Sequence, residues 1–373
     1  MRLVLRHEIP EDDNLRRQWN ELVLRMESPE VFFTYEWALA VCRGYEGSMR
    51  PLLMLGYERE TLAGVVALAI DEELQKASFL AGNTADYCDF VSDPSQRLEF
   101  VNLVLRELRA VAPHLALPNL PTSSATAQAL KDSSARQGCA HFSRPAFQCA
   151  QVDLSSSALR ESVRRAVRSK KNIRYQLRAM AKTGPVEVHH LTDWREISEA
   201  LPAFHNAHLQ RFFSMGRTSN LVDPQRWDFL LGLARLLSDQ GWLTLSGLSV
   251  GSQPIAWNYG FRFAGSWFYY QPTFDTRFRN HDPGLCLLAR IVEDACDRNE
   301  IRRVDLGLGD EAYKQRFATS HRETVYVTVT SSVAHHVRER LRYHTASAIK
   351  SVPPLEHCIR WLLGKTATGS ARA

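Results

Sequence analysis

The chain of 373 residues lacks the features that mark several specialised classes of protein. No run approaches the roughly 20 consecutive apolar residues that a membrane-spanning helix needs. The N-terminus offers only the apolar stretch Leu3 to Leu5 before charged residues begin, so we expect no secretory leader and a cytoplasmic location. Hydrophobic residues make up 45% and charged residues 23%, which excludes collagen-like, coiled-coil and disordered chains.

The cysteines are few, and their spacing is irregular. They form no CxxC pair, and their odd number does not suit a disulfide framework. Small buried thiols in a reducing compartment are the expected outcome, with no metal site. The seven are Cys42, Cys88, Cys139, Cys149, Cys286, Cys296 and Cys358.

A chain of this length exceeds what a single hydrophobic core usually supports, so we expect two domains. Residues 132–144 are small and polar, which favours a domain end there. We place the boundary so that residues 1–150 form the first domain and 151–332 the second, followed by a basic helical tail over 333–373.

The periodicity of apolar residues predicts a mixed α+β order in both halves. A helix between Gln271 and Arg303 allows the strands on either side of it to lie parallel. The helices are expected at 15–26, 31–42, 98–111, 159–182, 194–213, 224–239, 284–298 and 310–317. The strands are expected at 52–57, 62–70, 77–80, 115–117, 186–191, 242–250, 254–263, 266–271, 303–307 and 323–331, and turn residues at 118–124.

One helix start is typical of an anion site. Asp282 suits the N-cap position and Pro283 the first helical position. The free N–H groups of Gly284 and Leu285 would then face outward at the positive end of the helix dipole. Three basic side chains just before it, Arg277, Arg279 and His281, would add charge for a diphosphate. The alternative is a capped structural helix on a polar loop.

Several motifs in sequence order resemble one family. They are the segments 86–89 (DYCD), 169–174 (SKKNIR), 208–212 (HLQRF), 270–275 (YQPTFD), 282–285 (DPGL) and 305–317 (DLGLGDEAYKQRF). Together they resemble the CelD/BcsL-type acyltransferases of the GNAT fold, associated with cellulose and exopolysaccharide synthesis and related to Fem-type aminoacyl transferases. The similarity covers roughly residues 19–331.

The resemblance implies tandem GNAT-like domains of Fem type, the first degenerate, with mixed sheets flanked by helices. It implies direct transfer from acetyl-CoA or another acyl-CoA to a nitrogen or oxygen of a cell-envelope or exopolysaccharide sugar or amine. In this fold the strands around the cofactor helix splay apart and hold the pantetheine arm. By the resemblance, Tyr269, Tyr270 and Gln271 line the pantetheine, and Arg279, Pro283, Gly284 and Leu285 hold the diphosphate.

The chain departs from the family at Asp282, where a neutral residue is usual. A capping carboxylate there would compete with a diphosphate for the same N–H groups. This departure keeps open a non-catalytic binding protein that retains the GNAT fold.

Acyl transfer needs a base for the acceptor, an acid for the leaving group and stabilisation of the oxyanion. Asp305 points opposite to its apolar neighbours on a strand and is the first choice for the base. Tyr313 is the candidate acid, Lys314 the candidate for stabilising negative charge, and His208 a second choice for the base. Acceptor contacts are predicted at Asp86, Tyr87, Asp89 and Arg211. Each of these residues also has a structural reading, as a turn former, packing residue or solvated charge.

Basic residues recur along residues 160–182 at steps of three and four, which would form one helical face if the helix is unbroken. The tail from His335 onward carries seven Lys and Arg against two Glu, a surplus of five. These charges favour an anionic acceptor, membrane headgroups or tRNA. A Fem-like transferase that uses aminoacyl-tRNA is therefore the second hypothesis, while a charged face over a buried stripe is the structural alternative.

Overall fold

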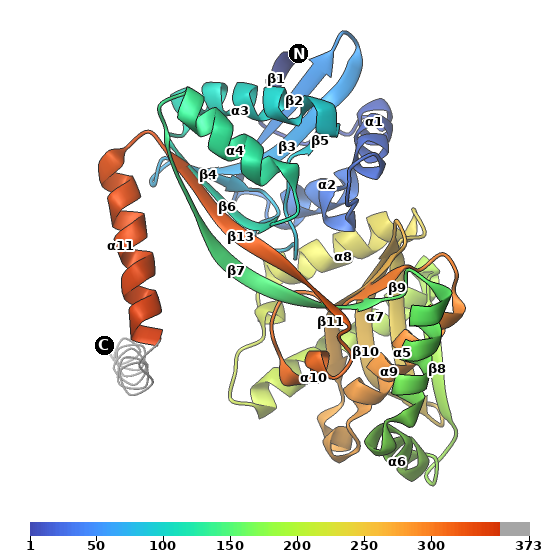
Figure 1. Cartoon of the computed structure of the whole chain (residues 1–373). Helices are drawn as coiled ribbons and strands as arrows, with labels where there is room; N and C mark the ends of the chain where they lie inside the picture. The colour runs from blue at the N-terminus through green and yellow to red at the C-terminus, as the bar shows by residue number, and fades with distance from the viewer. Residues whose placement is uncertain (351–373) are drawn as a thin grey trace, which may run out of the picture.

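A computed structural model describes residues 1–350 of the chain, with side chains up to residue 345. The predicted fold class is confirmed, because helices flank both faces of a mixed sheet (Figure 1). The first half contains β1 (Arg2–Arg6), α1 (Asp13–Leu24), η1 (Val31–Phe33), α2 (Tyr35–Gly44), β2 (Arg50–Glu58), β3 (Thr61–Asp71), β4 (Lys76–Phe79), β5 (Val91–Ser92), η2 (Pro94–Gln96), α3 (Arg97–Val111), β6 (His114–Pro121), α4 (Ala125–Arg136) and β7 (Ala140–Asp153).

The second half begins with two short helices and ends with a helix that projects from the body of the molecule. Its elements are α5 (Ser157–Ser169), α6 (Lys171–Met180), β8 (Val186–Leu191), α7 (Trp194–Ser214), η3 (Asn220–Val222), α8 (Pro224–Ser238), β9 (Leu243–Val250), β10 (Gln253–Phe263), β11 (Ser266–Phe274), η4 (Thr276–His281), α9 (Pro283–Asp297), β12 (Arg303–Asp305), α10 (Ala312–Gln315), β13 (Ser320–Thr330) and α11 (Val333–Lys350).

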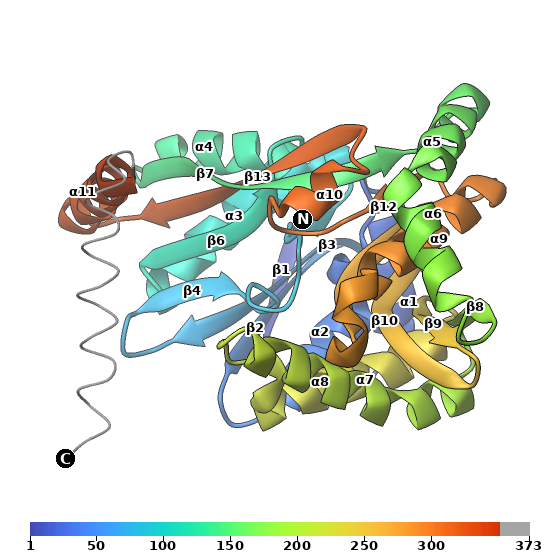
Figure 2. The ribbon, with the colours of Figure 1, turned by 90° about the horizontal axis from the view of Figure 1, so that it is seen from below.

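The sheet runs without interruption through both halves, in the order β1-β2-β3-β4-β6-β13-β7-β12-β11-β10-β9-β8, and β5 pairs with β3. Two long antiparallel strands, β7 and β13, cross from one half to the other (Figures 1 and 2). The C-terminal end of β7 pairs with β12, while β13 pairs with β6 along its other edge. The last strand of the chain therefore completes the sheet of the first half.

One hydrophobic core spans both halves. Its centre is Trp37 on α2, whose ring makes edge contacts with Phe229 of α8, Phe261 of β10 and Tyr270 of β11. A side chain at Gly44 would lie 2.5 Å from the Phe229 backbone, so α2 and α8 approach as closely as they do because this position is glycine. Full burial of Trp37 ties the first half to the strand that borders the candidate site.

The local sequence explains where the helices near the site begin. The Asp223 carboxylate accepts a hydrogen bond from Gln225 N–H, with Pro224 as the first residue of α8. Asp193 caps α7 in the same way through Arg195 and Glu196 N–H. Such caps satisfy backbone donors that the first turn of a helix leaves free.

The single helix expected at 159–182 is wrong in one respect, since it divides into α5 and α6 at Lys170, whose backbone is extended. The basic residues therefore do not form one continuous face. Arg160 donates hydrogen bonds to the carbonyls of Arg298 and Ile301 just past α9, and Arg164 pairs with Asp297 at 2.6 Å. These two arginines therefore fit the structural alternative. They donate hydrogen bonds to free carbonyl groups at the C-terminal end of α9, and their charge offsets the negative end of the helix dipole.

The periodicity of apolar residues does not predict five elements of the first half: β1, β5, η2, α4 and β7. Residues 132–144, expected to mark the end of the first domain, contain the end of α4 and the start of β7. The early part of β7 alternates between exposed and half-buried side chains and carries Pro145, so it lacks the apolar pattern of a strand. Strand β6 also continues to Pro121 through residues that read as a turn.

No helix in the described part of the chain has both the length and the apolar character that a membrane crossing requires. Part of the predicted basic tail is helical, as α11, and carries Arg338, Arg340 and Arg342. The rest of that prediction, including Arg360, Lys365 and Arg372, lies outside the described residues.

Candidate functional site

The site lies where two parallel strands part. β11 and β12 pair in parallel, as predicted, and their last paired residues are Phe268 and Asp305. β12 ends there, whereas β11 continues from Tyr269 to Phe274, paired with β10 along its other edge. A stretch of β11 is therefore left with one free edge beside the end of β12, and this fork is the splay that the resemblance implies.

A loop from the first half reaches this fork. Gly307, just after β12, has a left-handed backbone with φ of 71°. A Cβ atom added there would lie 2.6 Å from Asp86 Oδ2 and 3.7 Å from the Tyr269 carbonyl oxygen. Glycine is therefore required at this position both by its φ angle and by the approach of the carboxylate. Asp86 thus lies at the point where β11 and β12 separate.

Asp305, the last residue of β12, is fully buried. Its Oδ2 accepts hydrogen bonds from Tyr87 Oη at 2.9 Å and Gln151 Nε2 at 2.7 Å, and its Oδ1 accepts one from Gly307 N–H at 2.9 Å. A carboxylate enclosed by three donors is held rigidly and has no exposed surface with which to reach an acceptor. Asp305, the first choice for the base from sequence, is therefore held next to Gly307 with no exposed surface.

Asp86 has the chemical properties of a general base. The Asp86 residue as a whole is partly exposed, unlike Asp305, although its carboxyl group is enclosed. Burial, and then the neighbouring charge of Asp305, raise its pKa to about 7, although Lys314 and Arg226 act in the opposite direction. A carboxylate whose pKa is near neutrality can accept a proton at physiological pH and release it again.

Two residues of α10 lie close to the carboxyl pair. Lys314 is buried, and its Nζ donates to the Leu308 carbonyl at 2.5 Å and pairs with Glu311 at 2.9 Å. Tyr313 is half-buried, and burial, followed by the charge of Glu311, raises its pKa. The Tyr313 hydroxyl therefore remains protonated at neutral pH, which is the state that a proton donor needs.

The start of α9 is open to an anion. Asp282 has a left-handed backbone and makes no side-chain cap; its Oδ2 instead accepts a hydrogen bond from Asn172 Nδ2 at 3.2 Å. The expected competition by a capping carboxylate is therefore absent here. Among the described residues the Gly284 N–H has no partner, whereas the Leu285 N–H bonds the Asp282 carbonyl at 3.0 Å. Pro283 is the first helical residue, as predicted.

The basic residues before α9 are not equivalent. Arg277 forms an ion pair with Asp275 at 2.6 Å. His281 Nδ1 lies 3.2 Å from Gln176 Oε1. Arg279 is exposed and has no ion-pair partner among residues 1–345, whose side chains the structure describes, so among these three it is the one free to contact a ligand.

The free edge of β11 is partly closed. Pro272 has no N–H, and its carbonyl already accepts a hydrogen bond from Arg211 Nη1 at 2.8 Å. The Arg211 guanidinium also lies over the ring of Phe274 at 4.9 Å. A ligand amide therefore finds no backbone donor at Pro272 and would have to share its carbonyl with Arg211, a feature that the resemblance did not predict.

The tyrosines predicted to line the pantetheine point to opposite faces of β11. Tyr269 is buried in the core beneath α9. Tyr270 faces the other core, where its hydroxyl donates to the Thr84 carbonyl and accepts from Arg226 at 2.9 Å. These bonds tie β11 to the loop that carries Asp86, so Tyr270 positions that loop.

His208 and Gln271 lie next to one another. His208 is buried, its Nδ1 lies 2.8 Å from Ser219 Oγ, and its ring stacks on Phe212. Burial, and then the charge of Arg211, lower its pKa to about 4, although a hydrogen bond with Gln271 opposes this. The imidazole is therefore neutral at pH 7 and enclosed, which favours its structural reading.

Asp89 is not part of the cluster. Its buried carboxylate lies 3.6 Å from Arg97 Nη1 and accepts a hydrogen bond from Phe90 N–H at 2.7 Å. The sequence motif treats Asp86 and Asp89 alike, but the loop directs only Asp86 into the fork.

The sequence interpretation missed the residues that support the cluster from a distance. Gln151 comes from β7, and Arg322 of β13 lies over the ring of Tyr87 at 4.2 Å. Arg322 is paired with fully buried Glu30, which also accepts from Arg303 at 2.8 Å. No local motif marks these residues, because they meet only when β7 and β13 cross between the halves.

Comparison with protein families matches residues 167–315 to the acetyltransferase (GNAT) domain. The chain thus contains a GNAT domain and is a transferase. No curated protein sequence matches it.

Three solved structures are similar in fold. A structure of FemX has a TM-score of 0.60 at 11% identity, covering 84% of this chain and 95% of that chain. The C-terminal domain of a putative lysylphosphatidylglycerol synthetase from Agrobacterium fabrum has 0.54 at 13%, covering 88% and 95%. A conserved protein of unknown function from Bacteroides thetaiotaomicron has 0.58 at 11%, covering 88% and 100%. These likenesses show that the chain shares the fold of FemX and of the other two proteins.

Proposed function

We propose that this transferase moves an acyl group directly from its donor to a hydroxyl or amine of the acceptor, with Asp86 as the general base. The observation that carries the proposal is the position of Asp86, whose carboxylate lies beside Gly307 at the fork of β11 and β12. A pKa of about 7 suits this group to its task.

In the proposed reaction Asp86 takes the proton of the acceptor as its oxygen or nitrogen attacks the acyl carbon. The bond between the acyl carbon and the leaving atom then breaks, and Tyr313 supplies the proton that the leaving group needs. Lys314, buried beside this cluster, offsets negative charge as the oxyanion develops. Asp305 is a positioning residue, because it orients Gly307 and Tyr87 and raises the proton affinity of Asp86.

The proposed donor is an acyl-CoA, acetyl-CoA being the simplest. The Gly284 N–H, the exposed Arg279 and the absence of a side-chain cap at Asp282 fit a diphosphate at the start of α9. Tyr269 and Gln271 remain the proposed neighbours of the pantetheine, and Leu285 and Pro283 those of the phosphates. The acceptor, a cell-envelope or exopolysaccharide sugar or amine, is supported by the resemblance to CelD/BcsL-type transferases.

A second donor, aminoacyl-tRNA, is favoured by one observation. Pantetheine needs backbone partners along β11, and Pro272 removes a donor there while Arg211 occupies its carbonyl. An aminoacyl ester on the 3′ end of an RNA does not need that strand edge. The exposed basic residues of α6, Lys171, Arg174 and Arg178, would contribute to binding its phosphates.

Peripheral contact with a membrane remains a proposal and is supported by α11. Val333, Val337 and Leu341 are exposed at steps of four, and so form an apolar stripe on a helix that also carries arginines.

Calorimetry with the full chain distinguishes the donors. Titrations with acetyl-CoA, with a long-chain acyl-CoA and with aminoacyl-tRNA are compared for the wild type, Arg279→Gln and a control, Arg290→Gln. Arg290 lies further along α9 and pairs with Glu293. Micromolar binding of an acyl-CoA that weakens in Arg279→Gln alone supports the first donor, and binding of charged tRNA alone supports the second. Binding of neither donor would contradict the proposal and leave a non-catalytic protein.

A further inference from the structure

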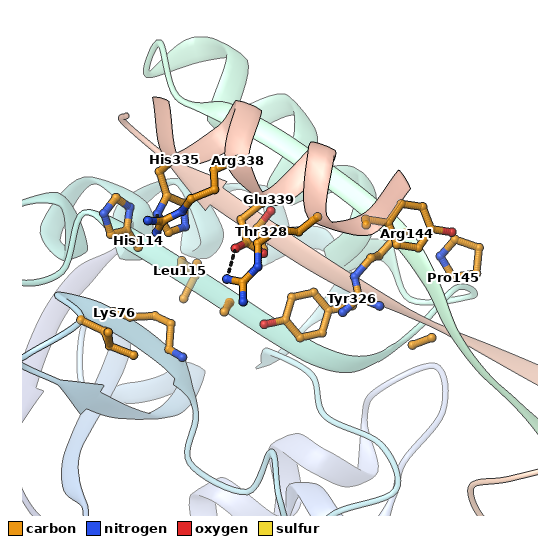
Figure 3. A pocket seen from close by; sticks show the side chains of 15 residues that line it. Lys76, His114, Leu115, Arg144, Pro145, Tyr326, Thr328, His335, Arg338 and Glu339 are labelled. Carbon is orange, nitrogen blue, oxygen red and sulfur yellow. Dashed lines mark hydrogen bonds and ion pairs between the residues drawn. The ribbon is translucent and has the colours of Figure 1, made fainter. Parts of the chain in front are cut away.

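A second hollow lies far from the fork, between α11 and the sheet of the first half (Figure 3). Its volume is about 890 Å³. Tyr326 and Thr328, at alternate positions of β13, form part of its floor, and His114 and Ala116 of β6 lie beside them. No step of the proposed acyl transfer uses this cavity.

The lining of the cavity is strongly cationic. Lys76 comes from β4, Arg144 from β7, and Arg338 and Arg342 from α11. Glu339 is the single carboxylate among the lining residues, and it pairs with Arg342 at 3.6 Å. Lys76 and Arg144 have no ion-pair partner within the described chain. Converging cations from three elements are not what a solvated helix face produces, and in a hollow they concentrate a positive field.

Aromatic rings keep this charge in place. The Arg144 guanidinium lies over the ring of Tyr326 at 4.3 Å and near that of Tyr343 at 5.6 Å. Stacking of this kind holds the guanidinium plane while its N–H groups stay available to a ligand. Figure 3 shows Lys76 on the opposite side of the hollow from Arg338 and Arg144.

Two imidazoles complete the lining. His114 and His335 stack with ring centroids 3.9 Å apart and planes 12° from parallel, and His114 Nδ1 lies 2.8 Å from Thr330 Oγ1. Burial lowers the pKa of both rings, and each is also lowered by Arg338. The charges of His114 and Lys76 lower the pKa of His335 further, whereas the charge of Glu339 raises it. Both rings are therefore neutral at pH 7 and can take up a proton if an anion enters.

We propose that this cavity binds a phosphate ester or diphosphate group. Phosphate oxygens would accept hydrogen bonds from Lys76, Arg144 and Arg338. The guanidinium groups of the two arginines are well suited to phosphate, because each can donate two parallel hydrogen bonds to it. The cavity is large enough for a molecule of nucleotide size. The cationic side chains that line it would recognise the phosphate group of such a molecule. The inference does not depend on the identity of the acyl donor or acceptor.

The test is calorimetric titration of the full chain with inorganic pyrophosphate at low salt. The double variant Lys76→Gln/Arg338→Gln should weaken binding at least tenfold. Arg340→Gln is the matched control, because Arg340 lies on α11 near Phe142 and does not line the cavity, and it should change affinity less than twofold. Thermal unfolding of each variant checks that the fold is intact.

The pH dependence adds a second readout. Because bound phosphate favours the charged form of His114 and His335, affinity should increase from pH 8 to pH 6 with uptake of a proton. Titration in two buffers of different ionisation enthalpy measures that uptake.

A parallel arm uses vesicles with phosphatidylglycerol at about a third of the lipid. Binding to vesicles but not to pyrophosphate, lost in the double variant, would assign the phosphate to a lipid headgroup at the same cavity. Pyrophosphate binding lost in the double variant assigns a soluble ligand. Absence of binding in both arms, or binding that the double variant leaves unchanged, overturns the proposal.

Discussion

The substitution Asp305→Asn tests the carboxyl pair through the pH dependence of turnover. It removes the second of the two causes that raise the pKa of Asp86, after burial, and leaves the burial in place. Unit charges roughly 6 Å apart at an effective dielectric constant of about 40 interact by about 1.4 kcal/mol, or about one pKa unit. The pKa of Asp86 should therefore fall from about 7 by about one unit.

The assay is kcat/KM measured from pH 4.5 to 9 for the wild type and the variant. Since Asp86 must be ionised to accept a proton, activity falls on the acid side, and that limb should move by about one unit to lower pH. The plateau should fall modestly, because a weaker base is less efficient. Asp310→Asn, which removes an exposed carboxylate from the same segment, is the control and should leave the limb in place. A limb that does not move in Asp305→Asn would refute the assignment of the base to Asp86.

Other substitutions probe the site and its support. Asp86→Asn should raise the free energy of unfolding at pH 8 by about 1 to 2 kcal/mol, after allowance for its partial exposure, and have no such effect at pH 4. The sign follows because a carboxyl group with a raised folded pKa binds more protons folded than unfolded, so stability falls as pH rises from about 4 to 7; urea unfolding at both pH values measures it. Gly307→Ala should lower turnover, and should lower the free energy of unfolding by about 1 to 3 kcal/mol, because the new Cβ would displace the Asp86 carboxylate and the φ angle there is positive. Unchanged turnover would contradict the close approach of Asp86 to Gly307. Arg279→Gln should weaken acyl-CoA binding about five- to tenfold with kcat unchanged, as judged by calorimetry and initial rates. Trp37→Ala should cost about 3 to 5 kcal/mol in chemical unfolding, and a smaller loss would mean that the two halves do not share a core.

The sequence predicts the local structure of the second half because its patterns are local. The apolar stripe of α9, its start at Pro283 and the parallel pairing of β11 with β12 all follow from spacing and stop signals. The first half is less regular, and β7 was missed because none of the residues in its first part, 140–148, is buried and one of them is Pro145.

The arrangement of the site could not be predicted from local patterns. Tyr87 and Asp305, which share a hydrogen bond, are 218 positions apart in the chain. Strand alternation places Asp305 away from its apolar neighbours, but it does not show that Tyr87, Gln151 and Gly307 enclose it. Local patterns also do not show which aspartate of the 86–89 loop enters the fork, because Asp89 pairs with Arg97 at the start of α3.

The central claim concerns the proton that Asp86 removes from the acceptor. The most direct measurement is single-turnover transfer by Asp86→Asn with donor bound, alongside donor affinity by calorimetry. The account predicts unchanged donor affinity and transfer slower by about 10²- to 10⁴-fold, the usual contribution of a general base. Transfer within threefold of the wild type, at equal donor occupancy, would contradict it.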